Sequence, residues 1–218
     1  MDQIPNKIKS RLKNYYHGEI DLSSINKTNI KNENDLIIYL KPINNIRRVN
    51  KFHEQINSKL NYNGLYLCSA NTLEQRRIIF REKIPAGFKT FFRIIDFFFK
   101  RVIPKLPILK NVYFSLTKGY NRAISKAEML GRLISCGFDV IEYFEYNSRL
   151  YVISKKNKKP DFNMNPSYGP ILKIDRVGYN GEIIKVYKMR TMYPYSEYCQ
   201  ELILKENDFN SGGKVFND

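Results

Sequence analysis

The sequence predicts an α/β fold, and three observations support that class. Two short apolar runs, residues 36–40 and 65–69, are bounded by polar or turn residues, as strands buried on both faces of a parallel sheet are. Between them, from Asn44 to Leu60, apolar residues recur every three or four positions, which is the period of an amphipathic helix. Two extended stretches near the middle of the chain then predict a terminal antiparallel hairpin.

The N-terminal part of the chain predicts a leader followed by a strand–helix–turn–strand unit. Residues 1–34 are rich in Asn, Lys and Ser, so we expect a partly disordered polar leader and ordered structure from Asp35 onward. Asn63 and Gly64 supply the turn into the second strand. His53 lies beside the apolar face of the helix, so we expect a packed or surface histidine rather than a catalytic base.

The segment from Phe88 to Val102 predicts a helix that is apolar on almost every side. One narrow polar stripe remains, made of Lys89, Arg93, Asp96 and Lys100. At ~1.5 Å per residue the helix is roughly 22 Å long, which is too short to cross a bilayer core. Two interpretations stay open: a helix lying in a membrane interface, or a helix packed between a sheet and neighbouring helices.

The next helix has clear boundaries in the sequence. Ser125 and Glu128 have the spacing of a capping box, and Gly137 stands where a helix can end in the left-handed conformation. Residues 138–146 and 150–154 then form the predicted hairpin.

Composition limits the classes of partner and of site. Lys and Arg outnumber Asp and Glu by 37 to 21, a formal charge of +16, which favours phosphate-bearing partners such as anionic lipid or nucleotide sugars. A solvated basic surface is the alternative, and no nucleic-acid-binding signature accompanies the charge. Three scattered cysteines and two histidines predict neither a disulfide framework nor a metal site. The N-terminus lacks the apolar core of a signal peptide, so we expect a cytoplasmic chain.

A second segment begins after the predicted α/β domain of residues 35–155. A basic linker, residues 156–164, leads into residues 165–218, where composition and pattern change. Asn180 and Gly181 predict a tight hairpin turn, because both residue types accept positive φ angles.

The sequence resembles known families in two places, and the first is the predicted α/β domain of residues 35–155, the front domain. The order of its elements, ending in a capped helix with Ser-Cys-Gly-Phe and a hairpin, is similar to the second half of a Rossmann-like methyltransferase. No glycine-rich turn precedes a strand, so this resemblance implies a degenerate, half-methyltransferase sheet without a cofactor.

The second resemblance rests on an ordered set of residues in the last segment. The set comprises Gly169, Pro170, Arg176, Gly178, Asn180, Gly181, Lys188, Met189, Arg190, Thr191 and Met192. It resembles the start of the catalytic domain of bacterial sugar transferases, the polyprenyl-phosphate phosphoglycosyltransferases, in a Bacteroidetes-type form with a methyltransferase-like front. So many fixed positions make the match more specific than one short glycine motif.

The sugar transferase resemblance implies an activity and roles for several residues. The family moves a sugar phosphate from a nucleotide sugar to a polyprenyl phosphate carrier in cell-surface polysaccharide biosynthesis. Lys188 and Arg190 lie two apart on a predicted strand and so share a face, where they could clamp phosphate oxygens, and Arg176 on the facing strand could add a third donor. The alternative is that all three are ordinary exposed strand cations.

The resemblance also implies that essential chemistry lies outside this sequence. The family's catalytic Asp-Glu pair, which works with magnesium, occurs well downstream of the motif, and neither Glu206 nor Asp208 has its context. We therefore expect an incomplete, inactive N-terminal portion, peripheral at the inner face of the plasma membrane. The alternative is a non-catalytic methyltransferase-like module that docks on a membrane or a protein partner.

Overall fold

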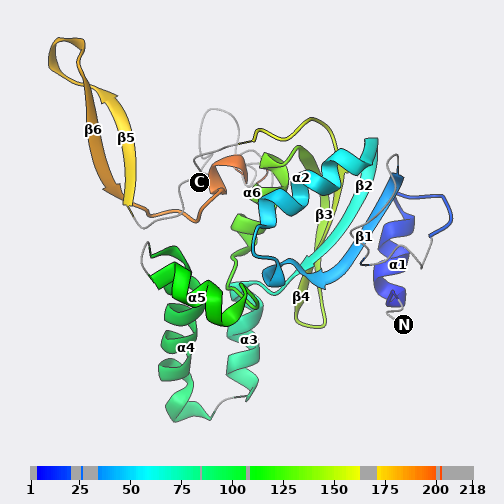
Figure 1. Ribbon diagram of the computed structural model, residues 1–218. Coiled ribbons are helices and arrows are strands. Elements are labelled where there is room, and N and C mark those ends of the chain that lie inside the picture. The colour runs from blue at the N-terminus through cyan, green and yellow to red at the C-terminus, as the bar shows by residue number, and fades with distance from the viewer. Residues whose placement is uncertain are drawn as a thin grey trace, which may run out of the picture.

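The protein has a mixed α/β architecture. The computed structural model describes residues 4–20, 26, 34–83, 85–106, 109–162, 171–199 and 202. A four-stranded sheet has the order β1 (Asn34–Pro42), β2 (Leu60–Ala70), β4 (Arg149–Lys156) and β3 (Phe138–Tyr146) (Figure 1). The predicted α/β class is confirmed, with a parallel β1–β2 pair and an antiparallel β3–β4 hairpin. The sheet as a whole is mixed rather than parallel, because β4 also runs antiparallel to β2.

Helices cover both faces of this sheet. Helices α2 (Val49–Lys59) and α6 (Lys126–Ser135) pack on one face, where the strands contribute side chains such as Ile37 and Val152. Helix α1 (Asn6–Lys13) covers the other face, against the neighbouring side chains Ile38 and Ile153. Alternate residues of each strand therefore serve different cores, as the two-residue period of a strand requires.

The leader contains structure that the sequence interpretation missed. We expected order to begin at Asp35, whereas Ile8 and Leu12 of α1 are both fully buried. Asn26 also contacts the sheet edge: its backbone N–H donates to the carbonyl of Ile38 at 2.9 Å, and its side-chain oxygen accepts from the amide of Leu40 at 2.7 Å. Burial of Ile4, Ile8 and Leu12 outweighs the polar composition of this segment.

Helix α6 begins and ends as predicted. The Ser125 hydroxyl accepts a hydrogen bond from the Glu128 amide at 3.1 Å, which is the predicted N-cap. Gly137 follows the helix with φ of +85°, and a Cβ there would lie 2.2 Å from the carbonyl oxygen of Lys158. Position 137 therefore requires glycine for two reasons, its backbone angle and its crowded surroundings.

A helical arm, residues 73–117, lies between β2 and α6 in the chain. Its elements are α3 (Leu73–Lys83), the short 3₁₀ turn η3 (Ala86–Phe88), α4 (Lys89–Phe97), the π-helical turn η4 (Phe98–Val102), the 3₁₀ turn η5 (Ile103–Lys105) and α5 (Leu109–Thr117). The helix predicted from residue 88 to 102 is confirmed as α4 with η4. Figure 1 shows the arm projecting from the sheet rather than lying between sheet and helices.

The last segment leaves the sheet domain and returns to it. Strands β5 (Ile171–Val177) and β6 (Ile183–Met189) form a separate antiparallel hairpin that stands away from the four-stranded sheet in Figure 1. The 3₁₀ turn η7 (Ser196–Cys199) then packs against α6, where the Cys199 thiol is fully buried and donates to the carbonyl of Ala127 at 3.3 Å.

Candidate functional site

The motif hairpin has the turn that its sequence predicts. Asn180 and Gly181 adopt φ angles of 60° and 81°, and the Gly178 amide donates to the carbonyl of Glu182 at 2.7 Å. The Asn-Gly turn is therefore confirmed. Gly169 and Pro170, which open the motif, lie outside the residues that the structure describes.

The strand register decides which predicted phosphate-binding residues share a face. Arg176 stands opposite Ile184, and Lys188 stands opposite Leu172. Because opposite residues in an antiparallel pair project to the same side and alternate along each strand, Arg176 and Lys188 share one face. They lie at opposite ends of it, however, four positions or roughly 13 Å apart.

The other two motif residues follow the hairpin. Strand β6 ends at Met189, so Arg190 lies just past the strand rather than on it, and its side chain is half-buried. Thr191 comes next and is exposed. Lys188 and Arg190 are thus close in the chain at the open end of the hairpin, while Arg176 lies near the turn. The hairpin by itself does not gather the three cations into one cluster.

The hairpin exposes apolar side chains on both of its faces. Val177, Ile183 and Met189 are 72 to 82% exposed on one face, and Ile184 is 49% exposed on the other. A two-stranded hairpin with this much exposed apolar surface has no core of its own. We therefore expect further protein to cover it.

The hairpin offers no carboxylate set for the magnesium ion that the sugar transferase resemblance implies. Asp175 lies opposite Lys185, on the face away from Arg176 and Lys188. Within the described residues, no group of three His, Cys, Asp or Glu side chains comes together. The residues described here do not fit the ion.

A second cluster, which the sequence interpretation missed, lies between α3 and α4 of the helical arm. Arg76, Arg77, Arg81 and Arg93 line a hollow of about 540 Å³ together with Asp96. Arg76 donates to both carboxylate oxygens of Asp96, at 2.7 and 3.1 Å. We call this hollow the arginine pocket; the basic pair Arg77–Arg81, four residues apart on α3, was the sequence signal that could have located it.

The arginine pocket is lined by one carboxylate, that of Asp96, which forms ion pairs with two cations. Besides the contacts from Arg76, Asp96 receives the ammonium of Lys100 at 3.4 Å. Arg77, Arg81 and Arg93 make no ion pair with any residue in the described part of the chain. Four arginines and one carboxylate thus line the pocket, so its described lining carries a net positive charge.

The arginine pocket borders a surface that we call the aromatic face. It comprises the exposed apolar side chains of η3, α4 and η4, namely Phe88, Phe91, Phe92, Ile94, Ile95, Phe97, Phe98 and Phe99. Each of them is 43 to 61% exposed. Ile94, Phe97 and Phe98 also line the pocket. Of the two interpretations of this helix, the exposure contradicts packing between a sheet and helices, and so large an apolar surface indicates an interaction site.

A buried polar network ties Tyr195, in the segment that follows the hairpin, to the sheet domain. The Arg132 guanidinium donates to Glu128 at 2.9 Å and to the side-chain oxygen of Asn50, and it lies 4.5 Å from the ring centre of Tyr195. Asn50 in turn donates to the Tyr195 hydroxyl at 2.7 Å. These groups bind one another inside the protein, so we assign them a structural role.

His53 and two of the cysteines are buried without catalytic surroundings. His53 is fully buried beside Tyr66, and burial, followed by the charge of Arg132, lowers its pKa to about 3. The imidazole is therefore neutral and packed, as the sequence predicted. Burial raises the pKa of the Cys68 and Cys136 thiols to about 12, which makes them poor nucleophiles.

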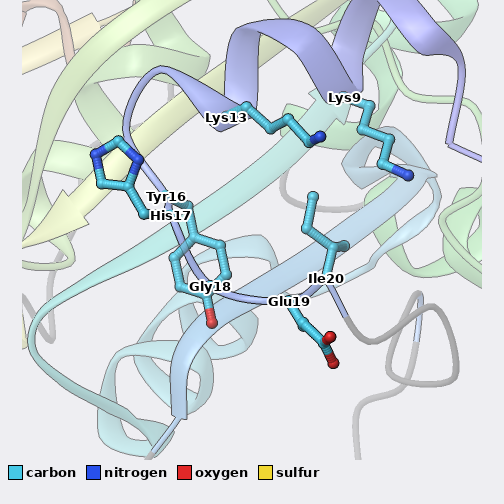
Figure 2. A pocket seen from close by; sticks show the side chains of 7 residues that line it. All are labelled: Lys9, Lys13, Tyr16, His17, Gly18, Glu19 and Ile20. Atoms are coloured by element: carbon cyan, nitrogen blue, oxygen red, sulfur yellow. The ribbon is translucent and has the colours of Figure 1, made fainter.

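A shallow hollow of about 500 Å³ lies where α1 meets the following loop. Figure 2 shows Lys9 and Lys13 above Ile20, with the Glu19 carboxylate pointing away from both lysines. Both ammonium groups belong to exposed side chains, and no buried polar group faces the hollow. We assign it no binding role.

No helix among the described residues is both long enough and apolar enough to span a membrane.

Comparisons with known proteins add little to this geometry. No family model and no curated protein matches the sequence. One similar solved structure is a possible exported protein from Bordetella parapertussis, with 14% sequence identity and a TM-score of 0.37. The match covers 61% of this chain and 42% of that chain, so this chain spans less than half of that structure's length.

Proposed function

We propose that this chain is the front portion of a sugar transferase that moves a sugar phosphate from a nucleotide sugar to a polyprenyl phosphate, in cell-surface polysaccharide biosynthesis. The observation that carries the proposal is the ordered motif from Arg176 to Met192, set on a hairpin whose Asn180–Gly181 turn has the two positive φ angles that the motif calls for.

The exposed hairpin supports the same proposal. Its two apolar faces would be covered by the remainder of a transferase domain, which would also bring the acidic pair that this sequence lacks. The order of the front sheet, with β4 antiparallel between β2 and β3, supports the finer proposal of a half-methyltransferase sheet.

In this proposal, the strand register assigns the cations to different anionic groups of the substrates. Lys188 and Arg190, at the open end of the hairpin, are placed to contact one group of phosphate oxygens. Arg176, roughly 13 Å away along the same face, would contact a different anionic group. The proposed substrates contain two separate anionic groups, because a nucleotide diphosphate and a lipid phosphate take part in the same reaction.

The complete enzyme would work at the cytoplasmic face of the plasma membrane, with the aromatic face as its peripheral contact. The same surface favours a second candidate function, a non-catalytic module that docks on a membrane or a protein partner. The two candidates differ in whether sugar phosphate is transferred.

The test is transfer of sugar phosphate from a panel of UDP-sugars to polyprenyl phosphate with magnesium. This chain would be compared with an extended version that carries the downstream Asp-Glu segment. We expect activity in the extension alone. Lys188→Gln in the extension should lower kcat/KM at least tenfold, because it removes a charged phosphate ligand.

The matched control is Lys185→Gln, on the same strand but on the opposite face of the hairpin, which should change kcat/KM less than twofold. Transfer by the short chain would contradict the claim that chemistry is missing from it. No transfer by a folded extension across the whole panel would contradict the transferase proposal and favour the docking module.

A further inference from the structure

We propose that the arginine pocket binds the phosphate of an anionic phospholipid in a bilayer, and that the aromatic face enters the same bilayer beside it. This inference rests on the membrane contact of the proposed function and names its ligand. The site shares no residue with the sugar transferase motif, so vesicle binding and sugar-phosphate transfer can fail separately.

The charge of the arginine pocket indicates the first part of the ligand. Arg77, Arg81 and Arg93 converge from two helices, and Asp96 is occupied by Arg76 and Lys100. These three guanidinium groups, which have no carboxylate partner among the described residues, present many N–H donors in a small space. Phosphate oxygens match this arrangement, because the planar guanidinium fork can bind two of them at once.

The apolar border of the pocket indicates that the phosphate belongs to a lipid. Ile94, Phe97 and Phe98 line the same hollow and are 59, 44 and 54% exposed. A free phosphate would leave these side chains in water and gain nothing from them. A phospholipid would bury them against its glycerol and acyl groups while its phosphate meets the arginines.

The length of the apolar helix also favours an orientation parallel to the membrane surface. Residues 88–102 extend only roughly 22 Å as a helix, so their aromatic side chains would enter at the interface rather than span the core. The Arg76–Asp96 contact fixes α4 against α3, so the pocket is formed before a lipid arrives. The excess of 16 positive charges on the chain favours approach to an anionic surface.

The first experiment is co-sedimentation of the full chain with vesicles of phosphatidylcholine alone and with 30% phosphatidylglycerol. We expect binding to the anionic vesicles. Arg77→Gln with Arg81→Gln should weaken it at least tenfold, because each cation near an anionic surface contributes about fivefold. The matched control is Lys9→Gln with Lys13→Gln, which removes the same charge from the hollow in Figure 2 and should cost at most about twofold.

The second experiment uses the absence of tryptophan from the sequence. Phe98→Trp places a single tryptophan at the pocket, and Tyr62→Trp places one on β2, where the native tyrosine is 66% exposed. Excitation at a wavelength that tyrosine does not absorb isolates the tryptophan emission. On anionic vesicles, the emission at position 98 should shift to shorter wavelength and be quenched by brominated acyl chains. The emission at position 62 should do neither.

Three outcomes would overturn the proposal. The first is no binding to vesicles with phosphatidylglycerol. The second is equal weakening by the arginine and lysine double variants, which would indicate general charge attraction. The third is a change in the emission at position 98 with inorganic phosphate alone, at the concentration of the lipid phosphate, which would indicate a site for the free anion. All substituted residues are exposed, and matching unfolding midpoints would establish that each variant folds.

Discussion

Arg76 and Asp96 form a two-pronged ion pair, at 2.7 and 3.1 Å, that joins α3 to α4. Their side chains are only 11 and 15% exposed. The pair therefore acts in partly dry surroundings, where a charge-assisted double hydrogen bond is strong. It sets the spacing of the two helices that bound the arginine pocket.

Asp96→Asn should loosen the helical arm. The substitution removes the charge that Arg76 and Lys100 share, and we expect the free energy of unfolding to fall by about 2 kcal/mol in urea titrations. Hydrogen exchange of α3 and α4 should rise more than that of the sheet. Glu82→Gln, at an exposed position near the end of α3, is the control and should change little. Equal effects of the two substitutions would show that the pair does not fix the arm.

Gly131→Ala should displace the end of the described chain from α6. A Cβ at position 131 would lie 1.9 Å from the carbonyl oxygen of Tyr195, a contact that backbone must move to relieve. We expect a loss of about 2 kcal/mol in unfolding free energy and faster chymotrypsin cleavage near Tyr195. Gly87→Ala meets no atom within 4 Å and should be neutral. Unchanged cleavage in Gly131→Ala would mean that η7 does not depend on this contact.

Ser125→Ala should remove the N-cap of α6. The lost bond to the Glu128 amide leaves that N–H without its side-chain acceptor, at a cost of about 1 kcal/mol in unfolding free energy. Ser125→Thr, which keeps the capping hydroxyl, should retain more of the stability than Ser125→Ala. Ser115→Ala, on the exposed side of α5, is the control for loss of a serine hydroxyl. If both alanine variants behave alike, the cap contributes nothing measurable.

Protonation of His53 should weaken the fold below neutral pH. Its pKa is about 3 in the folded protein and about 6.5 when unfolded, so between these values the unfolded chain binds the additional proton. Stability therefore falls as pH falls from 6.5 toward 3, by up to about 1.4 kcal/mol per pH unit. The buried Nε2 atom lacks a hydrogen-bond partner, which adds to the cost of charging the ring.

His53→Phe should flatten this pH dependence between pH 6 and 4.5, as measured by urea unfolding at several pH values. The matched control is His17→Gln, which removes the other histidine at an exposed position. A slope in His53→Phe equal to that of the unaltered protein would assign the acid sensitivity to other groups.

The candidate site was only partly accessible from the sequence. The motif named Arg176 and Lys188 on facing strands, and the strand register shows that they share one face of the hairpin. The alternation argument for Lys188 and Arg190 was weaker, because β6 ends at Met189. Their separation along that face follows from the register, which depends on how two strands pair across the turn. The arginine pocket was missed because Arg93 and the pair Arg77–Arg81 come from different helices, and their distance depends on how α4 packs on α3.

The sequence by itself determined the local features of this protein. Apolar runs and their period predicted the two parallel strands and α2, and residue chemistry predicted the cap at Ser125, the left-handed Gly137 and the turn at Asn180. Each of these depends on interactions within a few residues, which composition and spacing express directly.

Only the tertiary structure decided what is buried and what is left exposed. Helix α1 buries Ile8 and Leu12 against the sheet, η7 returns from beyond the hairpin to cover α6, and the apolar helix α4 keeps its aromatic side chains in solvent. The spacing of apolar residues in the sequence is the same whether a sheet, a membrane or water lies against the helix that they form. Its burial depends on partners that are distant in the chain, and these are fixed only when the whole fold has formed.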